Sequence, residues 1–424
     1  MYKPRKLLKP IDKFLKKGEI LVIHGARQTG KTTLLKIIRD KLINEKGVLP
    51  DNIFYFDLED FTFLEMFNKG HKEVVSYIES HKNIDKNNKI YILIDEIQYL
   101  DNPSPLLKIL HDHYEWLKII VSGSSSFQVK SKFKDSLAGR TVDFELYPLD
   151  FEEFLVFKEI NYDLSSFKAF QSETVNKELS GLFKEYLIYG GYPKIVLEKS
   201  IDAKETYLKQ VINTYVKKDI RDLGHIRDVN RFNKLLRVLA DKTGSLLNVL
   251  ELSSTIGISR PTIEEYLFIM ENTYIIKMVP PFYTNIRSEI SKMSKIFFED
   301  TGIANLLKYG VFLDKVSGEL FENAVYCAIR SALGKEIVKY WRTKQKTEID
   351  FIADLNFKKI PAEAKLSYPQ KSLSTLISFI DKYKQKDAWV ISLQKLSSGE
   401  DERIKSLYPW EIFAAAQDIK KHTA

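Results

Sequence analysis

The residues of this chain best suited to chemistry form a phosphate-binding loop near its start. The pattern G-x-x-x-x-G-K-[ST] is carried by Gly25, Ala26, Arg27, Gln28, Thr29, Gly30, Lys31 and Thr32. In such a loop, backbone N–H groups and the positive end of the following helix face the phosphates of a nucleotide. The Lys31 ammonium would reach the β- and γ-phosphates, and the Thr32 hydroxyl would help to hold Mg²⁺. The sequence thus predicts that this loop, together with Thr33, binds ATP or ADP.

A strand and a helix should hold the loop in place. Residues 20–23 are an apolar run of the kind found in a buried parallel strand. After the loop, apolar residues recur at helical spacing, at Leu34, Leu35, Ile37, Ile38 and Leu42. This strand–loop–helix order is the context in which the motif binds phosphate, and it argues against a glycine-rich turn without a ligand.

A second apolar run, residues 90–94, ends in two carboxylates, Asp95 and Glu96. Asp95 would belong to the Mg²⁺ shell, through water, and Glu96 would be the base that polarises the attacking water. A single carboxylate at a strand end could be a helix cap. Two of them at the edge of a sheet that carries a phosphate loop favour catalysis.

The fold that would position these groups is a doubly wound parallel α/β sheet of the P-loop type. Three more predicted strands, separated by helical patterns, lie at residues 53–56, 119–121 and 143–146. Ser122 or Ser124 would lie beside the γ-phosphate, although a turn of small residues explains them equally well.

Four segments together resemble a known family: GARQTGKT, ILIDEIQYL, VSGSSS and LAGRTVDFELYPLDFEEFL. They are similar to AAA-type ATPases of archaea and bacteria that carry a C-terminal domain of unknown function, as are LIYGGYP and YVKKDIR further on. The resemblance implies ATP hydrolysis in a homo-oligomeric ring, with an arginine finger from a neighbouring subunit. Arg140 is either that finger or a surface charge. Arg221 is either a phosphate contact or a solvated helix charge.

A second set of residues suited to chemistry lies in the last third of the chain. Asp350 is in one predicted strand, and Glu363 and Lys365 are in the next, two apart and therefore on one face. Two acids could hold Mg²⁺ or Mn²⁺, while the lysine could orient a water for attack on a phosphodiester. Upstream, Glu322 continues an apolar helical stripe, where a carboxylate is costly unless it is paired or bound to metal.

A helix acid, an aspartate and then Glu-x-Lys, in this order, resemble the PD-(D/E)xK nucleases of the restriction-endonuclease-like fold. The resemblance implies that Glu322, Asp350 and Glu363 are metal ligands, and that Asp350, Glu363 and Lys365 are catalytic. The sequence lacks the Pro-Asp pair of that pattern, because Ile349 precedes Asp350. The alternative is a nuclease-like scaffold that binds without cutting, with a salt bridge between Glu363 and Lys365.

Charge favours DNA as the partner of this segment. The whole chain has 65 Lys and Arg against 57 Asp and Glu, a formal net charge of +8. Residues 282–395 contain 19 basic and 13 acidic residues and so hold +6 of that charge. A basic run with an aromatic residue lies beside the predicted catalytic strand, at Lys339, Trp341, Arg342, Lys344 and Lys346.

The segment at residues 246–282 resembles a winged helix-turn-helix. Gly257 is in its turn, and Ser259 would cap the second helix. Glu264 and Glu265 in that helix would repel phosphates, which favours a structural or protein-contact role. Arg260, at the start of the helix, is the residue best placed for DNA.

A chain of 424 residues is expected to form about three domains. The predicted parts are an AAA-type core, a helical lid, the winged-helix-like segment, a nuclease-like α/β domain and a tail, at residues 1–155, 156–245, 246–282, 283–395 and 396–424. Cys327, the single cysteine, is expected to be a core thiol of a protein in a reducing compartment. No apolar run reaches the ~18 residues that span a bilayer, so a cytoplasmic protein without a membrane partner is expected.

Two functions fit these patterns. The first is an ATP-hydrolysing protein that acts on DNA with a Mg²⁺-dependent nuclease-like domain. The alternative is a nucleotide-controlled switch or scaffold whose winged helix and nuclease-like domain bind protein or DNA without cleavage. A phosphotransferase is a third possibility, against which the Asp95–Glu96 pair argues.

Overall fold

The computed structural model describes residues 2–81, 83–124, 137–167, 172–216, 228–283, 293–355, 358–367, 373–395 and 401–423. Arg221 lies outside these ranges, as do Ser125 and Ser126 of the VSGSSS segment. The chain has two compact units. Among the described residues, the first comprises those up to Tyr147 together with Asn272–Tyr274, and the second comprises all the others.

The first unit is built on a parallel sheet with the strand order β2-β3-β4-β1-β5. Its strands are β1 (Ile20–His24), β2 (Ile53–Asp57), β3 (Ile90–Asp95), β4 (Leu117–Gly123) and β5 (Thr141–Glu145). All five predicted strands are therefore present. Since the strands are parallel, the loop after β1 and the carboxylates after β3 lie at the same edge of the sheet, on either side of the end of β4.

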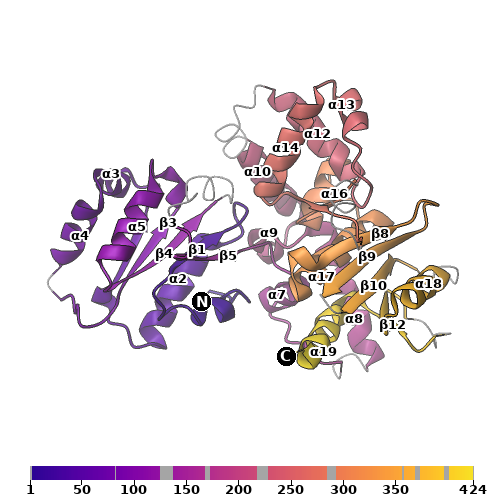
Figure 1. The fold of residues 1–424 in the computed structure, drawn as a ribbon, viewed down its shortest axis with the longest axis horizontal. Coiled ribbons are helices and arrows are strands. Elements are labelled where there is room, and N and C mark those ends of the chain that lie inside the picture. The colour runs from indigo at the N-terminus through magenta and orange to yellow at the C-terminus, as the bar shows by residue number, and fades with distance from the viewer. Residues whose placement is uncertain are drawn as a thin grey trace. The chain divides into compact units, whose positions relative to one another are not determined.

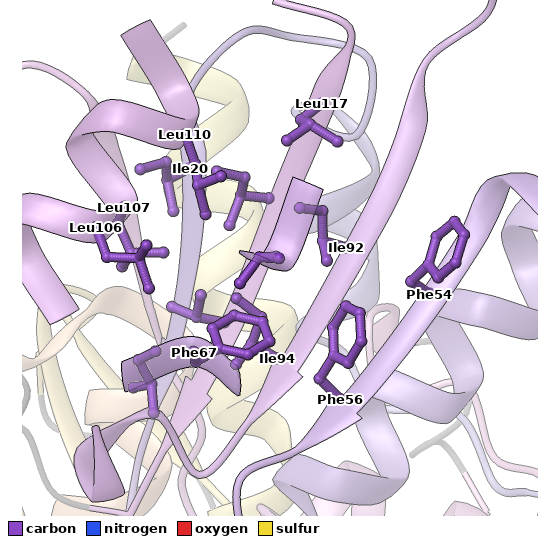
Figure 2. Packing of buried hydrophobic residues seen from close by; sticks show 14 of the residues in the cluster. Ile20, Phe54, Phe56, Phe67, Ile92, Ile94, Leu106, Leu107, Leu110 and Leu117 are labelled. Atoms are coloured by element: carbon purple, nitrogen blue, oxygen red, sulfur yellow. The ribbon is translucent and has the colours of Figure 1, made fainter. Parts of the chain in front are cut away.

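Helices cover both faces of this sheet. They are α1 (Leu8–Asp12), α2 (Lys31–Asn44), α3 (Phe61–Lys69), α4 (His71–Glu79) and α5 (Pro103–His113), with the 3-10 turns η1 (Pro50–Asn52) and η2 (Ile97–Tyr99). Ile92 and Ile94 of β3 pack in one hydrophobic cluster with Phe67 of α3 and Leu107 of α5 (Figure 2). Leu93, between them, packs in the other cluster with α2. This alternation follows from the period of two along a strand.

The second unit begins with a helical region. Its helices are α7 (Phe151–Phe157), α8 (Glu173–Tyr189), α9 (Pro193–Leu197), α10 (Ile201–Thr214), α12 (Val229–Asp241), α13 (Val249–Ile256), α14 (Arg260–Asn272) and α16 (Thr301–Tyr309). Polar side chains accept hydrogen bonds from the first turns of several of them, at Ser172, Ser200, Asp228 and Asn248. After α14, β6 (Ile276–Val279) pairs antiparallel with β7 (Lys295–Phe298).

A second, mixed sheet has the strand order β12-β11-β10-β9-β8, and its strands β8, β9, β10 and β12 are labelled in Figure 1. Its strands are β8 (Val338–Arg342), β9 (Glu348–Leu355), β10 (Lys358–Lys365), β11 (Ala388–Ser392) and β12 (Ile404–Leu407). The pairs β8–β9 and β9–β10 are antiparallel, whereas β10–β11 and β11–β12 are parallel. The helix α17 (Gly318–Leu333) and the turn η5 (Lys335–Ile337) precede β8, and α18 (Leu373–Tyr383) connects β10 to β11.

The expectation of a C-terminal tail after residue 395 is corrected by the structure. The strand β12 adds to the edge of the second sheet, and η7 (Pro409–Glu411) and α19 (Ile412–Thr423) follow it. Trp410 is fully buried, and Lys420 Nζ donates to the Ala332 carbonyl at 2.8 Å. The strand has only four residues, two of them buried, so it is too short to show a periodic pattern.

Close packing accounts for the two glycines of the LIYGGYP segment. Gly191 N donates to the buried Asp300 carboxylate at 2.7 Å, and the Gly191 carbonyl accepts from Leu149 N at 2.7 Å. A Cβ on Gly191 would lie 2.1 Å from the Leu149 carbonyl oxygen. A Cβ on Gly190 would lie 2.3 Å from Asp300 Oδ1. No larger residue fits at either position without displacing its neighbours.

Candidate functional site

The phosphate-binding loop joins β1 to α2. Gly30, directly before α2, has a φ of 98°, a left-handed conformation that glycine adopts at no steric cost. Thr29 Oγ1 donates to the Ala26 carbonyl at 2.8 Å and so closes the loop on itself. Arg27 is half-buried and Gln28 is exposed. Because α2 begins at Lys31, its positive N-terminal end lies at the loop, as anion binding requires.

Lys31 lies against the loop backbone. Its Nζ donates to the carbonyl oxygens of Gly25 at 3.1 Å and Ala26 at 2.9 Å. Thr32 and Thr33 are half-buried in the first turn of α2. The ammonium is thus held at the place where the loop would meet phosphate oxygens.

Arg5 also contacts the loop, and this contact is not predicted from the sequence. Its Nη1 donates to the Thr29 carbonyl at 2.7 Å, and its Nη2 donates to the Tyr147 carbonyl at 2.7 Å. The buried guanidinium therefore ties the loop after β1 to the chain that follows β5. An arginine in a basic N-terminal stretch gives no local signal of such a contact.

Asp95 is held at the end of β3 by neighbouring strands. Its Oδ1 accepts from Ser122 Oγ on β4, and its Oδ2 accepts from the Tyr55 hydroxyl on β2 at 2.9 Å. Burial and the nearby Asp95 carboxylate raise the pKa of Tyr55, so its hydroxyl remains a donor. Ser122, predicted beside the γ-phosphate, is therefore a direct partner of the predicted magnesium residue.

Glu96 has an unusual backbone conformation for a residue other than glycine, with a φ of 55°. Gln98 Nε2 donates to Glu96 Oε2, and Gln98 Oε1 accepts from Ser124 N at 3.1 Å. One amide side chain thus links the predicted base to the end of β4. Gln98 is not predicted from the sequence, although it lies only two residues after the predicted base.

Arg140 is not brought to the phosphate-binding loop of its own chain. Its carbonyl accepts from Ile20 N, at the opposite end of β1 from the loop. Its guanidinium donates to both carboxylate oxygens of Asp112, at 2.8 and 2.9 Å. At ~3.3 Å per residue, the length of β1 separates it from the loop by more than 10 Å.

In the second unit, three predicted residues meet on the antiparallel pair β9 and β10. Asp350 Oδ2 accepts from Ala364 N at 2.9 Å and from Lys365 Nζ at 2.8 Å. Lys365 Nζ also lies 3.0 Å from Glu363 Oε2. The structure therefore brings together Asp350, Glu363 and Lys365, and all but Lys365 are buried.

Glu322 of α17 joins this group through Lys295 of β7, which the sequence analysis missed. Lys295 Nζ lies 3.0 Å from Glu322 Oε1, 2.7 Å from Glu348 Oε1 and 3.9 Å from Asp350 Oδ1. Lys295 is only 2% exposed, and Arg342 Nη1 lies 3.2 Å from Glu348 Oε2. We call the following residues the carboxylate–cation cluster: Glu322, Glu348, Asp350, Glu363, Lys295, Lys365 and Arg342.

The acids of this cluster differ in their pKa values. Burial, with the neighbouring Asp350 carboxylate, raises the pKa of Glu322 to about 7 and the pKa of Glu363 to about 8. Burial would also raise the pKa of Asp350, but Lys365 and Lys295 outweigh it and lower that pKa below its usual value. Asp350 is therefore ionised at neutral pH, while the two glutamates titrate near neutrality.

The carboxylate oxygens of the cluster are the donor type that Mg²⁺ prefers. In the described part of the chain, however, no three His, Cys, Asp or Glu side chains are grouped so that they could hold one metal ion. Two ammonium groups, from Lys295 and Lys365, lie between the acids instead. The chemistry of the donors thus fits Mg²⁺, whereas their present arrangement is a network of ion pairs.

Replacing Lys295 by methionine is expected to lower the free energy of unfolding by about 3 kcal/mol at about pH 8, because buried acids lose a shared cation. The loss should shrink toward about pH 5.5. Burial raises the pKa of Glu322 to about 7 in the folded state, above its value in the unfolded chain. The folded state therefore binds more protons and gains stability as the pH falls through 7. Once Glu322 is protonated and neutral, the loss of the Lys295 cation costs less. Urea unfolding at both pH values measures the effect. The exposed Lys315→Met is the control, and an equal loss at both pH values would contradict the assignment.

Two other predictions concern the whole chain. Cys327 is buried in α17, where burial raises the pKa of its thiol to about 12, so the predicted core thiol is confirmed. Among the residues that the structure describes, no helix is both long enough and apolar enough to cross a membrane.

Three known families match successive parts of the chain. Residues 17–155 match the family described as an AAA domain, residues 180–312 match a domain of unknown function (DUF8612), and residues 317–413 match another (DUF4143). The first unit therefore carries an AAA-type ATPase domain, the class of nucleotide-binding domain that its sheet and loop define.

Relatives are found in bacteria and archaea. An uncharacterized protein of Haemophilus influenzae is 29% identical over 289 residues, which cover 67% of this chain and 68% of that protein. An uncharacterized protein of Methanocaldococcus jannaschii is 26% identical over 341 residues, 79% of this chain and 72% of that protein. Among solved structures, a Walker-type ATPase of Pyrococcus abyssi has 13% identity and a TM-score of 0.46, covering 72% of this chain and 96% of that one.

Proposed function

We propose that this chain is an ATP-hydrolysing AAA-type protein that acts on DNA through a metal-dependent, nuclease-like C-terminal domain. The observation that carries the proposal is the convergence of Glu322, Asp350, Glu363 and Lys365, from α17, β9 and β10, on one buried place. Charged residues are almost never buried unless they are paired or bound to a metal, and here two lysines pair with the acids while the carboxylates remain oxygen donors of the type that Mg²⁺ prefers. The basic charge of the same domain supports a polyanionic substrate.

In the first unit, the proposed reaction is hydrolysis of ATP to ADP and phosphate. The loop would bind the phosphates, with Lys31 against the β- and γ-phosphoryl oxygens. Thr32 and Asp95 would hold Mg²⁺, which neutralises charge on the phosphates. Glu96, oriented by Gln98, would take the proton of the attacking water.

The ATPase would work as a homo-oligomer. Arg140 lies at the far end of β1 from its own loop, so it could serve a nucleotide only on a neighbouring subunit. It would have to leave its ion pair with Asp112 to do so.

In the second unit, the proposed reaction is hydrolysis of a DNA phosphodiester. Glu322, Asp350 and Glu363 would hold Mg²⁺, which polarises the phosphate and lowers the pKa of water. Lys365 would orient the attacking water. This arrangement requires Lys295 and Lys365 to give up part of their contacts with the acids.

The winged-helix-like segment is proposed to contact protein rather than DNA. The helices α13 and α14 and the β6–β7 pair support a winged-helix arrangement. Arg260, the residue best placed for DNA, is paired with Glu264 at 2.8 Å. Its charge is therefore partly neutralised before any phosphate could reach it.

The second candidate function is a nucleotide-controlled switch that binds DNA or protein without cleavage. Lys295 favours it, because its ammonium lies among Glu322, Glu348 and Asp350 and neutralises them without a metal. In that function the cluster would stabilise the domain, and ATP would control what the domain binds.

Cleavage of DNA by the purified full chain tests the proposal. Linear, supercoiled and branched DNA would be incubated with Mg²⁺ or Mn²⁺, with and without ATP. The wild type should cut, and Asp350→Ala should reduce cutting to background, because Asp350 is the acid that stays ionised at neutral pH. The control is Asp354→Ala in the same strand, whose carboxylate pairs with Lys339 and Lys359 outside the cluster.

Each outcome has a distinct meaning. Cutting that is lost in Asp350→Ala but kept in Asp354→Ala supports the nuclease site. Equal cutting by Asp350→Ala excludes that site. No cutting by the wild type under any condition, with ATP hydrolysis intact, favours the switch.

A further inference from the structure

A pocket of about 560 Å³ lies beside the carboxylate–cation cluster in the second unit. Its described lining comes mainly from the β8–β9 hairpin and the end of α18. Pockets of this volume are typical of sites for small ligands. Neither proposed reaction uses Lys344, Lys346 or Tyr383, which line it.

Aromatic side chains form one wall of the pocket. The half-buried ring of Tyr383 packs on Phe379 with centroids 4.4 Å apart, and its hydroxyl accepts from Trp341 Nε1 at 3.3 Å. The Tyr340 hydroxyl donates to the Met293 carbonyl. These contacts hold the rings in place before any ligand binds. A fixed, partly exposed ring is a stacking platform for a nucleobase.

Cationic side chains surround this wall. Of the described lining residues four are basic and none is acidic: Arg342, Lys344, Lys346 and Lys382. Lys344 and Lys346 are exposed in the turn between β8 and β9, where Lys346 N donates to the Thr343 carbonyl at 3.1 Å. Lys382 Nζ lies 5.2 Å from the centroid of the Tyr383 ring. The pocket therefore combines a flat apolar face with positive charge, which complement the flat base and the negative phosphate of a nucleotide.

The pocket and the cluster share one residue, Arg342. Arg342 lines the pocket and pairs with Glu348 at 3.2 Å, and Glu348 pairs with Lys295 at 2.7 Å. Lys295 Nζ also lies 5.9 Å from the centroid of the Tyr340 ring, on the wall of the pocket. A polynucleotide strand held in the pocket would therefore pass next to the acids of the carboxylate–cation cluster.

We propose that this pocket binds one nucleotide of single-stranded DNA, with its base against Tyr383 and its backbone phosphates against Lys344 and Lys346. The inference rests on the proposed action on DNA and names the form of DNA that the domain takes. Single-stranded DNA is favoured over a duplex because base faces are stacked and hidden in a duplex, whereas the wall of the pocket is a ring. A duplex would use only the cations.

Binding of a fluorescein-labelled single strand of about 16 nucleotides to the full chain tests the inference. Fluorescence anisotropy in EDTA measures binding apart from any cleavage. Matched duplex DNA and single-stranded RNA of the same sequence are measured in parallel. The pocket variant is Lys344→Ala with Lys346→Ala, and the control is Lys386→Ala with Lys421→Ala, which removes equal charge from exposed positions outside the pocket lining.

The wild type should bind the single DNA strand more tightly than the duplex. The pocket variant should bind it at least about 10-fold more weakly. The slope of log affinity against log salt concentration should be smaller in magnitude by about 1.4, since two phosphate contacts are lost. The control should bind within about 2-fold of the wild type. In addition, 2-aminopurine in the strand should lose fluorescence on binding to the wild type, and less so with Tyr383→Leu.

Three results would overturn the inference. If the pocket variant and the control bind single-stranded DNA equally well, the pocket is not the site, while the proposed action on DNA stands. Tighter binding of duplex DNA or of RNA than of the single DNA strand excludes this form of substrate. If the wild type binds no DNA at all, both the proposed function and the inference fail.

Discussion

Replacing Lys31 by alanine is expected to reduce ATP hydrolysis by at least about 100-fold, because a preorganised charge at the transferred phosphoryl group supplies several kcal/mol of transition-state stabilisation. The side chain is 5% exposed, and its ammonium is held against the loop carbonyls of Gly25 and Ala26. Phosphate release from Mg·ATP measures the rate. Stabilisation of the folded chain by Mg·ATP should disappear as well, since it reports binding.

Two further variants make this result interpretable. Lys36→Ala removes an exposed lysine from the same helix and should leave hydrolysis unchanged. Glu96→Gln should keep stabilisation by Mg·ATP but stop hydrolysis, because the amide cannot accept the proton of the water. Hydrolysis that persists in Lys31→Ala would rule out the loop as the catalytic site.

Replacing Gly191 by alanine is expected to cost about 4 kcal/mol of stability or more, enough to unfold many domains. The new Cβ would lie 2.1 Å from the Leu149 carbonyl oxygen, which is backbone and cannot rotate away. Moving Leu149 would also break its hydrogen bond to Gly191 and disturb the bond from Gly191 to buried Asp300. Urea unfolding followed by tryptophan fluorescence is suitable, since Trp410 is fully buried in this unit.

The matched control is Gly181→Ala in the middle of α8. A Cβ at that glycine has nothing within 4 Å, so alanine should raise stability by about 0.5–1 kcal/mol through helix propensity. If Gly191→Ala unfolds at the same urea concentration as the wild type, the LIYGGYP segment is not held by the contacts described here.

Local patterns were enough to predict the sheet of the first unit. Strands buried on both faces are short apolar runs, and the residues at their ends are the ones that meet at the sheet edge. For this reason Asp95 could be placed at the same sheet edge as the loop before its contacts with Ser122 and Tyr55 were known. The pair of strands with Asp350 and Glu363 could be predicted likewise, because alternation along a strand assigns side chains to faces.

Contacts between segments that are distant in the sequence could not be predicted from local patterns. The Arg5 guanidinium donates to the carbonyls of Thr29 and Tyr147, and the Lys295 ammonium pairs with Glu322 and Asp350, which lie on other elements of the second unit. A lysine or arginine in the sequence is read as a surface charge, since its burial depends on acids or carbonyls supplied by other elements.

Spacing along the chain was enough to predict the loop at residues 25–32, the carboxylates at the end of the third strand, and the Asp350, Glu363 and Lys365 set. In each case the spacing along one loop or strand constrains where the side chains point. Three features came to light only in the folded chain: Lys295 neutralises the acids, Arg140 lies away from its own loop, and β12 adds to the edge of the second sheet. These features depend on which elements pack together, and that is settled by burial across the whole unit rather than by the period of any one segment.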